Sequence, residues 1–468
     1  MMRKSVVVLL AAILVAAFAL PAMADISFFG TAKVKPTYYH NFDFDDNQPD
    51  PPSANEGGLT AGEHVRSELR LGWKAGGDNW KIMMIAETDL IMEKDTVDRS
   101  FYVGATKGNP AQPNAGGEFG IERFEASYTF APALTLNTGW NIRAADIRTG
   151  GLLFGDDHPF IEIAGKLTDN LSYALTYIPI NNRQLSTGVS AIHDDWRVYM
   201  LKLNGTVGAG DVKATLSPMV LYSDNRLRNA GVYYYGIEAM GQIGMFKPSF
   251  EFVYADGEFR NTSLDIKSYA AFVGVEAAVS KAFTPYVAFR YGRGDDDSTD
   301  SDVEGFIGIT DIGRFTPLMG MDGNILSNSL PQPYANALYS FAPERKFVTH
   351  LYGGISDAGS GDNPGHKIIA FGAKGAISEP LSYKAQVFLI WYDKVGNLSN
   401  LKSPGTKVDK FAGTTFDVQA KYAFSKNFAT DLIYSVFVPG DGIKDQLDPA
   451  TADSTFAQTV ELTLAWSY

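Results

Sequence analysis

The chain has 468 residues, and its 53 Asp and Glu outnumber its 40 Lys and Arg, so the formal net charge is −13 at pH 7. This acidic balance argues against nucleic acid as a partner and favours a surface or a pore that attracts cations. The sequence has no cysteine, which excludes disulfides, thiolate metal sites and covalently attached c-type haem.

The N-terminal segment has the pattern of a secretory signal peptide. Arg3 and Lys4 precede an apolar run that begins at Val6, and small residues after this run offer a cleavage site. The apolar run has 15 residues, whereas a helix that spans a membrane needs about 20. We therefore expect residues 1–24 to be cleaved on export and residues 25–468 to form a single domain.

After this segment, eighteen stretches of sequence alternate between apolar and polar residues, as β-strands with two different faces do. They span residues 26–40, 63–74, 79–90, 118–130, 134–143, 160–167, 171–180, 196–204, 211–223, 231–245, 248–254, 268–280, 285–292, 367–377, 381–393, 414–424, 428–439 and 455–468. One more apolar run, 347–355, is expected inside a loop, because bacterial single-chain barrels have even strand numbers. Totals of about 16 or about 20 strands stay open.

The connections between these strands are alternately short and long. Eight are turns of a few residues, such as 131–132 and 425–427, and nine are longer, such as 41–62 and 293–366. This alternation is typical of a β-barrel with short turns at one end and long loops at the other, and with both chain termini at the short-turn end. A soluble β-sandwich, which is the alternative, does not predict it.

The last strand has the most specific pattern. Val460, Leu462, Leu464, Trp466 and Tyr468 share one face, and mostly polar residues occupy the other. This ending resembles the closing strand of Gram-negative outer-membrane β-barrels, where a C-terminal aromatic residue is part of the assembly signal. With its strand pattern and this ending, the chain resembles the porin superfamily over its whole mature length, without the motif of any subfamily.

The resemblance implies an all-β fold, a transmembrane antiparallel up-and-down β-barrel of about 18 strands in the cell outer membrane. It also implies that the barrel-assembly machinery recognises Trp466 and Tyr468 and that outer-membrane lipid surrounds the barrel; a homotrimer is one arrangement left open. Barrels of roughly 16–18 strands enclose an aqueous channel. We therefore expect a porin through which small hydrophilic solutes or ions diffuse passively, without a cofactor.

Two other functions would use the same fold. One is a substrate-specific outer-membrane channel, and the other is a barrel sheath for a trans-outer-membrane cytochrome conduit. An enzyme is disfavoured, because the six His are scattered without ligand spacing and the sequence has neither a G-x-S-x-G nor an H-E-x-x-H motif.

Charged side chains within the strands should line the lumen, because a charge that faces lipid costs about 2–4 kcal/mol at mid-membrane. The pore-lining candidates are Arg66, Glu68, Arg70, Arg123, Glu125, Asn141, Arg143, Asp417 and Lys421. Facing rows of basic and acidic groups would set a transverse field across a pore, but a lumen held together by salt bridges without a selective role is equally open. Glu122 and Glu238 fall on otherwise apolar faces, which indicates a bulge or a shifted register.

One external loop carries five aspartates between residues 295 and 302. Oxygen ligands at this density suit a hard divalent cation, with Asp295, Asp297, Asp300 and Asp302 as the candidate ligands. The simpler interpretation is a solvated acidic loop, because the Gly and Glu of an EF-hand are missing.

The loop 293–366 has 74 residues and many apolar side chains. Loops longer than about 15 residues are usually functional or disordered. We expect part of this loop to constrict or cap the pore, and a pair of extra strands is the alternative.

Overall fold

The computed structural model describes residues 25–40, 63–91, 118–146, 148–181, 195–210, 212–226, 229–297, 299–306, 308–309, 364–446 and 456–468. The expected signal peptide, 1–24, and the apolar run 347–355 lie outside these residues, so both expectations stay predictions. No helix in the described part of the chain is long and apolar enough to cross a membrane.

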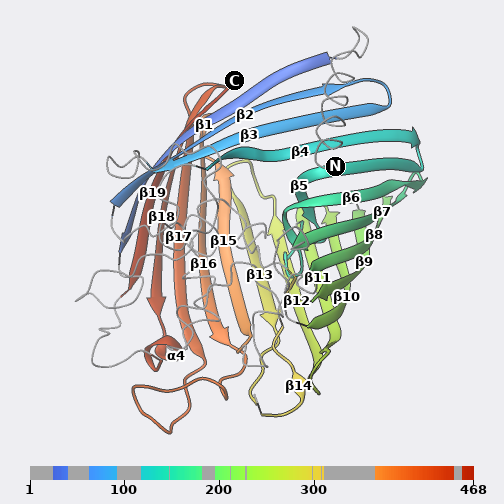
Figure 1. Cartoon of the computed structure of the whole chain (residues 1–468). Helices are drawn as coiled ribbons and strands as arrows, with labels where there is room; N and C mark the ends of the chain where they lie inside the picture. The colour runs from blue at the N-terminus through green and yellow to red at the C-terminus, as the bar shows by residue number, and fades with distance from the viewer. Residues whose placement is uncertain are drawn as a thin grey trace.

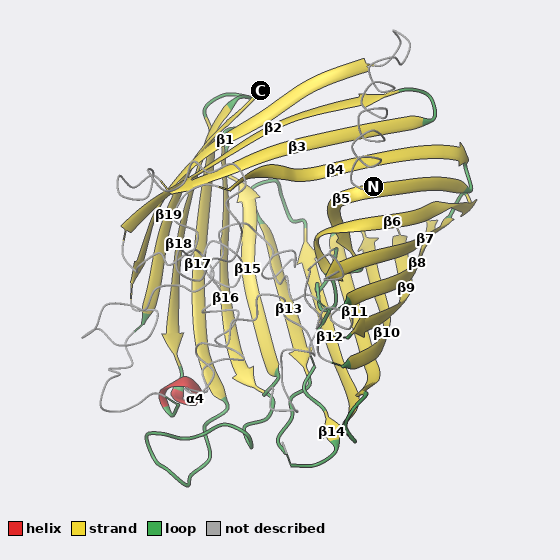
Figure 2. Ribbon diagram, in the orientation of Figure 1, coloured by secondary structure: helices red, strands yellow, loops and turns green. Residues whose placement is uncertain are grey.

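Eighteen long antiparallel strands form one closed barrel (Figures 1 and 2). They are β1 (Asp25–His40), β2 (Glu63–Gly76), β3 (Trp80–Ile91), β4 (Glu118–Ala131), β5 (Leu134–Ala144), β6 (Gly155–Thr168), β7 (Leu171–Asn181), β8 (Trp196–Ala209), β9 (Val212–Asn225), β10 (Ala230–Ile243), β11 (Phe246–Phe259), β12 (Asp265–Ala277), β13 (Thr284–Gly292), β15 (His366–Ala376), β16 (Leu381–Tyr392), β17 (Phe411–Ala423), β18 (Phe428–Pro439) and β19 (Ala457–Ser467). The two-residue β14 (Asp302–Val303) pairs in parallel with β12 and stands outside this cycle. A short helix, α4 (Asp441–Lys444), follows β18 (Figure 2).

The sheet closes where its first strand meets its last. Strand β1 pairs with β2 along one side and with β19 along the other. Beside this seam, Gly30 and Tyr468 exchange two backbone hydrogen bonds, with N···O distances of 3.4 and 3.2 Å. Closure leaves the barrel without a sheet edge, so the strands satisfy one another's backbone groups.

All eighteen expected strands are present, and the largest errors in their limits are of five residues, at the ends of β8 and β11 and at the start of β6. Strand β6 begins at Gly155, before the expected start at residue 160. The segment between these positions contains two aspartates and Pro159, a composition that local pattern assigns to a loop. Pairing with β5, in which Asn141 lies opposite His158, extends the strand nonetheless.

The outer wall is apolar and carries two rows of aromatic rings. At the short-turn end, Tyr422, Phe424, Phe428 and Trp466 follow one another at centroid distances of 4.7–5.2 Å. At the long-loop end, the rings of Tyr177, Tyr199, Tyr222, Tyr233 and Tyr235 follow at 4.5–6.4 Å. Such girdles at both ends of an apolar band are typical of a barrel that spans a membrane.

Glu122 and Glu238, the two glutamates that the sequence pattern placed on apolar faces, have separate explanations. In β4, Ile85 pairs with Arg123 but Ala86 pairs with Ile121, so Glu122 is the extra residue of a β-bulge. Glu238 lies on a face of β10 that points inward and is 1% exposed. Its apolar neighbour on that face, Tyr234, is buried as well, and the assignment of this face to lipid was therefore wrong.

That inward apolar face exists because loops fill part of the lumen at the long-loop end. A cluster of buried apolar side chains includes Leu152, Leu153 and Phe154 from the connection between β5 and β6. It also includes Phe306 and Ile309 from the start of the long loop after β13. The interior of the barrel thus has an apolar region under its loops and a polar region elsewhere.

The outer wall makes the first testable prediction. Val418 lies on the outer face of β17 and is 49% exposed. Val418→Arg should therefore destabilise the folded barrel in a bilayer by about 2–4 kcal/mol. Gln419→Arg is the matched control, because Gln419 faces the lumen and donates to Asp431 at 2.7 Å, a carboxylate that an arginine would also bind. Urea titrations of both variants in phospholipid vesicles measure the difference; equal losses would contradict the assignment of the two faces.

Candidate functional site

One wall of the lumen is lined by charged side chains that pair between neighbouring strands. Glu68 on β2 contacts Lys33 on β1 at 2.9 Å and Arg70 at 3.2 Å. Arg70 in turn contacts Glu87 on β3 at 3.1 Å and Glu122 in the bulge of β4 at 3.6 Å. One guanidinium group therefore stands among three carboxylates on three strands.

The same row continues over β4, β5 and β6. Arg143 contacts Glu125 at 3.1 Å and Glu162 at 3.7 Å, and its guanidinium carbon lies 3.4 Å from the ring centre of Phe160. Asn141 donates to the other oxygen of Glu125 at 2.5 Å. We call the charged side chains of this wall the charge ladder: Lys33, Lys35, Glu68, Arg70, Glu87, Glu122, Arg123, Glu125, Arg143 and Glu162.

The charge ladder brings most of the sequence candidates together: Glu68, Arg70, Arg123, Glu125, Asn141 and Arg143. Arg66 lies on β2 opposite Lys35, but its side chain is outside the described part of the structure. Asp417 and Lys421 lie apart from the ladder, on β17. Asp417 is buried and accepts from Gln386 at 2.8 Å, while Lys421 is exposed near the short-turn end. A role in solute passage stays a prediction for all of them.

The second feature of the lumen is a loop that folds into the barrel between β5 and β6; we call residues 145–154 the inserted loop. Its base is closed by a hydrogen bond from the Ala145 N–H to the Phe154 carbonyl at 2.8 Å. The buried carboxylate of Asp146 accepts from the N–H groups of Leu153 at 2.6 Å and Phe154 at 3.1 Å. The base therefore holds its shape through bonds within the loop.

The tip of the inserted loop binds the inner wall at β9, β10 and β11. Arg148 donates through Nε to Glu238 at 2.7 Å and through Nη2 to Ser217 at 2.7 Å. The N–H of Gly150 donates to Glu251 on β11 at 2.6 Å. These partners are about 70–100 residues away in the chain, which is why local sequence patterns did not reveal them.

The start of the long loop packs on the inserted loop. The Ile309 N–H donates to the Leu153 carbonyl at 2.7 Å, and the Phe306 N–H donates to the Arg293 carbonyl at 2.7 Å. We expected the loop 293–366 to constrict or cap the pore, and Phe306 and Ile309 near its start do pack in the same apolar cluster as the inserted loop. Residues 310–363 are outside the described part, so the role of the whole loop stays a prediction. The inserted loop was missed, although the apolar run at 152–154 was a signal for it.

The aspartates of the acidic loop mainly bind the loop's own backbone. Asp295 accepts from the N–H of Glu304 at 2.8 Å, and Asp297 accepts from the N–H and hydroxyl of Thr299. Burial raises the pKa of the Asp295 carboxyl, whereas the hydrogen bonds from Thr299 lower the pKa of Asp297. The described residues contain no group of three or more side chains placed to hold a metal ion. A calcium site at Asp295, Asp297, Asp300 and Asp302 stays a prediction without support from this geometry.

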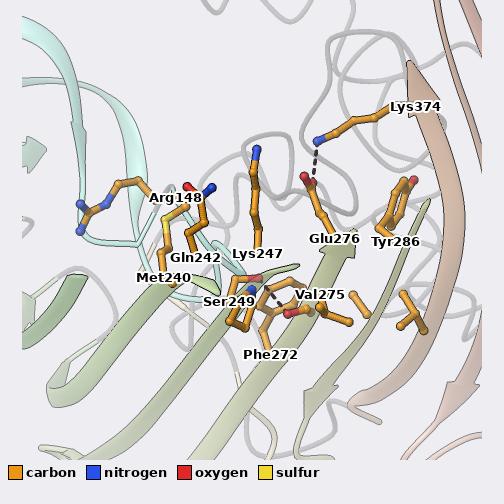
Figure 3. A pocket seen from close by; sticks show the side chains of 15 residues that line it. Arg148, Met240, Gln242, Lys247, Ser249, Phe272, Val275, Glu276, Tyr286 and Lys374 are labelled. Carbon is orange, nitrogen blue, oxygen red and sulfur yellow. Dashed lines mark hydrogen bonds and ion pairs between the residues drawn. The ribbon is translucent and has the colours of Figure 1, made fainter. Parts of the chain in front are cut away.

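Below the inserted loop, the lumen contains a cavity of about 440 Å³ (Figure 3). Its volume falls in the range of about 300–1,000 Å³ that is common for ligand sites. Polar side chains line it together with an apolar patch of Met240 and Phe272; the polar ones are Arg148, Gln242, Lys247, Ser249, Glu276, Tyr286 and Lys374. Figure 3 shows Lys374 reaching across to Glu276, at 2.5 Å. None of these residues is among the pore-lining candidates predicted from the sequence.

A closed 18-strand barrel with an apolar outer wall and a charged lumen is the fold of outer-membrane porins. Among solved structures, the chain is similar to Acinetobacter baumannii OccAB2, with a TM-score of 0.55 and 10% identity over 95% of this chain and 98% of that one. It is similar to Pseudomonas aeruginosa OccK9 (OpdG), with a TM-score of 0.54 and 10% identity over 95% and 98% of the two chains. It is also similar to Pseudomonas aeruginosa OpdK, solved with vanillate, with a TM-score of 0.52 and 9% identity over 94% and 98%.

At these identities the likeness is one of fold. No family model matches the chain. No curated protein sequence matches it either.

The charge ladder makes the second prediction. Arg70→Met removes the cation from between Glu68 and Glu87, whose side chains are only 8% and 11% exposed. Removing one partner of a buried ion pair destabilises a protein by about 3–5 kcal/mol. Because solvent reaches Arg70, we expect Arg70→Met to destabilise the folded barrel by a smaller amount, about 2–3 kcal/mol. Urea titration in vesicles measures this loss.

Lys74→Met is the control for that experiment, because Lys74 is exposed on the same face of β2. It should change the folding free energy by no more than about 0.5 kcal/mol. Arg70→Lys should fall between the two, since one ammonium group cannot bridge carboxylates on three strands as a guanidinium does. Equal losses for Arg70→Met and Lys74→Met would mean that the ladder does not stabilise the barrel.

Proposed function

We propose that this protein is a porin of the outer membrane, through which small hydrophilic solutes or ions diffuse passively along their gradients. The observation that carries the proposal is the contrast between the two faces of one closed barrel. The outer wall is apolar between two aromatic girdles, while charged and amide side chains such as Arg70 and Asn141 face inward. This distribution suits lipid outside and water inside.

A substrate-specific channel is the second candidate, and the inserted loop favours it. The loop folds into the interior, and Arg148 at its tip lines a cavity of about 440 Å³ that is partly polar and partly apolar. Such a lining can bind a small solute through both its charged and its apolar parts. The structure of OpdK with vanillate is an example of a similar barrel solved with a small organic molecule.

The cytochrome sheath gains no comparable support. The lumen that a partner protein would have to enter holds the inserted loop and the beginning of the long loop, both packed into one apolar cluster. We further propose that residues 1–24 direct export and that Trp466 and Tyr468 are recognised by the barrel-assembly machinery. A homotrimer, and the absence of enzymatic activity, stay predictions from the sequence.

Electrical recording in a planar bilayer tests the porin proposal. The purified protein should produce discrete conductance steps, and a salt gradient should give a reversal potential on the cation side because of the acidic net charge. That potential should shrink as the salt concentration rises and screens the charges. The absence of conductance steps would contradict the proposal, provided that heat-modifiability on gels shows the protein to be folded.

Solute uptake into liposomes separates the two candidates. A general porin should admit sugars and amino acids at rates that fall smoothly with solute size and rise linearly with concentration. A substrate-specific channel should show saturation for one class of solute, because the solute then occupies a site before it passes.

A further inference from the structure

Two glutamates on neighbouring strands face each other inside the barrel. Glu238 on β10 is directly opposite Glu251 on β11, and the two residues are 1% and 0% exposed. Like charges at opposite positions of adjacent strands are destabilising. A buried carboxylate also loses its hydration, so it persists only where other groups bind it. The barrel wall alone does not explain this pair.

The inserted loop supplies most of the groups that bind these two carboxylates. Glu238 receives hydrogen bonds from Arg148 of the loop and from Lys202 of β8, each at 2.7 Å. Glu251 receives the backbone N–H groups of Gly150 at 2.6 Å and Leu152 at 3.2 Å. The hydroxyl of Thr149 lies within hydrogen-bonding distance of both carboxylates, at 3.1 and 2.8 Å. The two glutamates thus bind four of the five positions from 148 to 152 at the loop tip.

The loop tip is shaped to make this contact. A Cβ atom on Gly150 would lie 2.5 Å from the Cβ of Phe272 and 2.8 Å from a carboxylate oxygen of Glu251, so only glycine allows the backbone to approach. Gly151 has a φ of +58°, which a residue with a side chain rarely adopts. Both glycines allow the backbone to place the N–H groups of residues 150 and 152 on the carboxylate of Glu251.

We propose that Glu238 and Glu251 form a two-carboxylate clamp, a pair of positioning residues that holds the tip of the inserted loop against the inner wall at β10 and β11 and so sets the width of the passage. The base of the loop has bonds of its own, from the N–H groups of Leu153 and Phe154 to Asp146 and from the Ala145 N–H to the Phe154 carbonyl. Loss of the clamp therefore frees the tip from the wall while these bonds still close the base. Arg148 lines the cavity as well as binding Glu238, so the clamp also fixes the position of the cavity's arginine.

The absence of cysteine from the chain allows a direct test that does not depend on conductance. Leu152 is 4% exposed beside the clamp, so a single Leu152→Cys variant should react slowly with a water-soluble maleimide while the loop is held. Adding Glu251→Gln replaces one acceptor oxygen by an NH₂ group, so the N–H of either Gly150 or Leu152 loses its acceptor. Because a buried N–H group without an acceptor destabilises the held position of the loop, the labelling rate should rise roughly tenfold or more.

Three further variants make the test specific. Glu461→Gln removes another buried, lumen-facing carboxylate, one that accepts from Thr463 on its own strand, and should leave the labelling rate unchanged. Glu238→Gln should raise the rate as Glu251→Gln does. Arg148→Gln changes the loop and leaves both wall glutamates in place, so it tests the clamp even if the wall variants fail to fold; it should also raise the rate.

The inference rests on the proposed function where it concerns the passage, and conductance tests that part. Glu251→Gln and Glu238→Gln should increase the single-channel conductance relative to the parent, and Glu461→Gln should not. If the parent is silent but the labelling rates respond, the porin proposal fails while the clamp stands. Unchanged labelling of Leu152→Cys in all three clamp variants, Glu238→Gln, Glu251→Gln and Arg148→Gln, would overturn the clamp.

Discussion

Closure of the sheet is the constraint on which the rest of this structure depends. Hydrocarbon offers no partner to a backbone N–H or C=O group, so strands that cross it must all pair with one another. Here the pairing of β1 with β19 completes the cycle, with Gly30 and Tyr468 bonded at its end. Once the cycle is closed, each strand has one face toward lipid and one toward the lumen. The period of two in the sequence follows from this division.

Closure also directs the charged side chains of the membrane-spanning band to the inner wall. The outer wall excludes charged groups from its apolar band, so acids and bases gather on the inner wall, close enough to pair. The charge ladder contains five cations and five carboxylates, and Arg70 shows the result by contacting three carboxylates on three strands. A neutral row of this kind keeps the wall hydrated without a large field, even though the chain as a whole is acidic.

The parts of the fold that sequence could predict are those that depend on residues near one another in the chain. The strands of the barrel, the outward rows of aromatic residues and half of the charge ladder follow from alternation, because lipid imposes the same rule on every strand. The failures share a different cause. The start of β6 at Gly155 depends on pairing with β5, and the inserted loop depends on Glu238 and Glu251, about 90 and 100 residues further on. A loop of this length has no period from which its partners could be found.

Outward positions of the strands are predictable because lipid requires apolar side chains there, whereas inward positions follow no such single rule. An inward position can be polar where it meets water, as Arg143 does, or apolar where it meets a loop, as Tyr234 does. A departure from strict alternation therefore says more about what covers the strand than about the strand itself. Glu238 seemed to break the pattern of β10 because that face is apolar, yet the face is apolar for the same reason that the glutamate is there: a loop lies against it. Such an arrangement, in which an acidic residue on an apolar inward face lies opposite a second acidic residue, thus indicates a loop that enters the barrel.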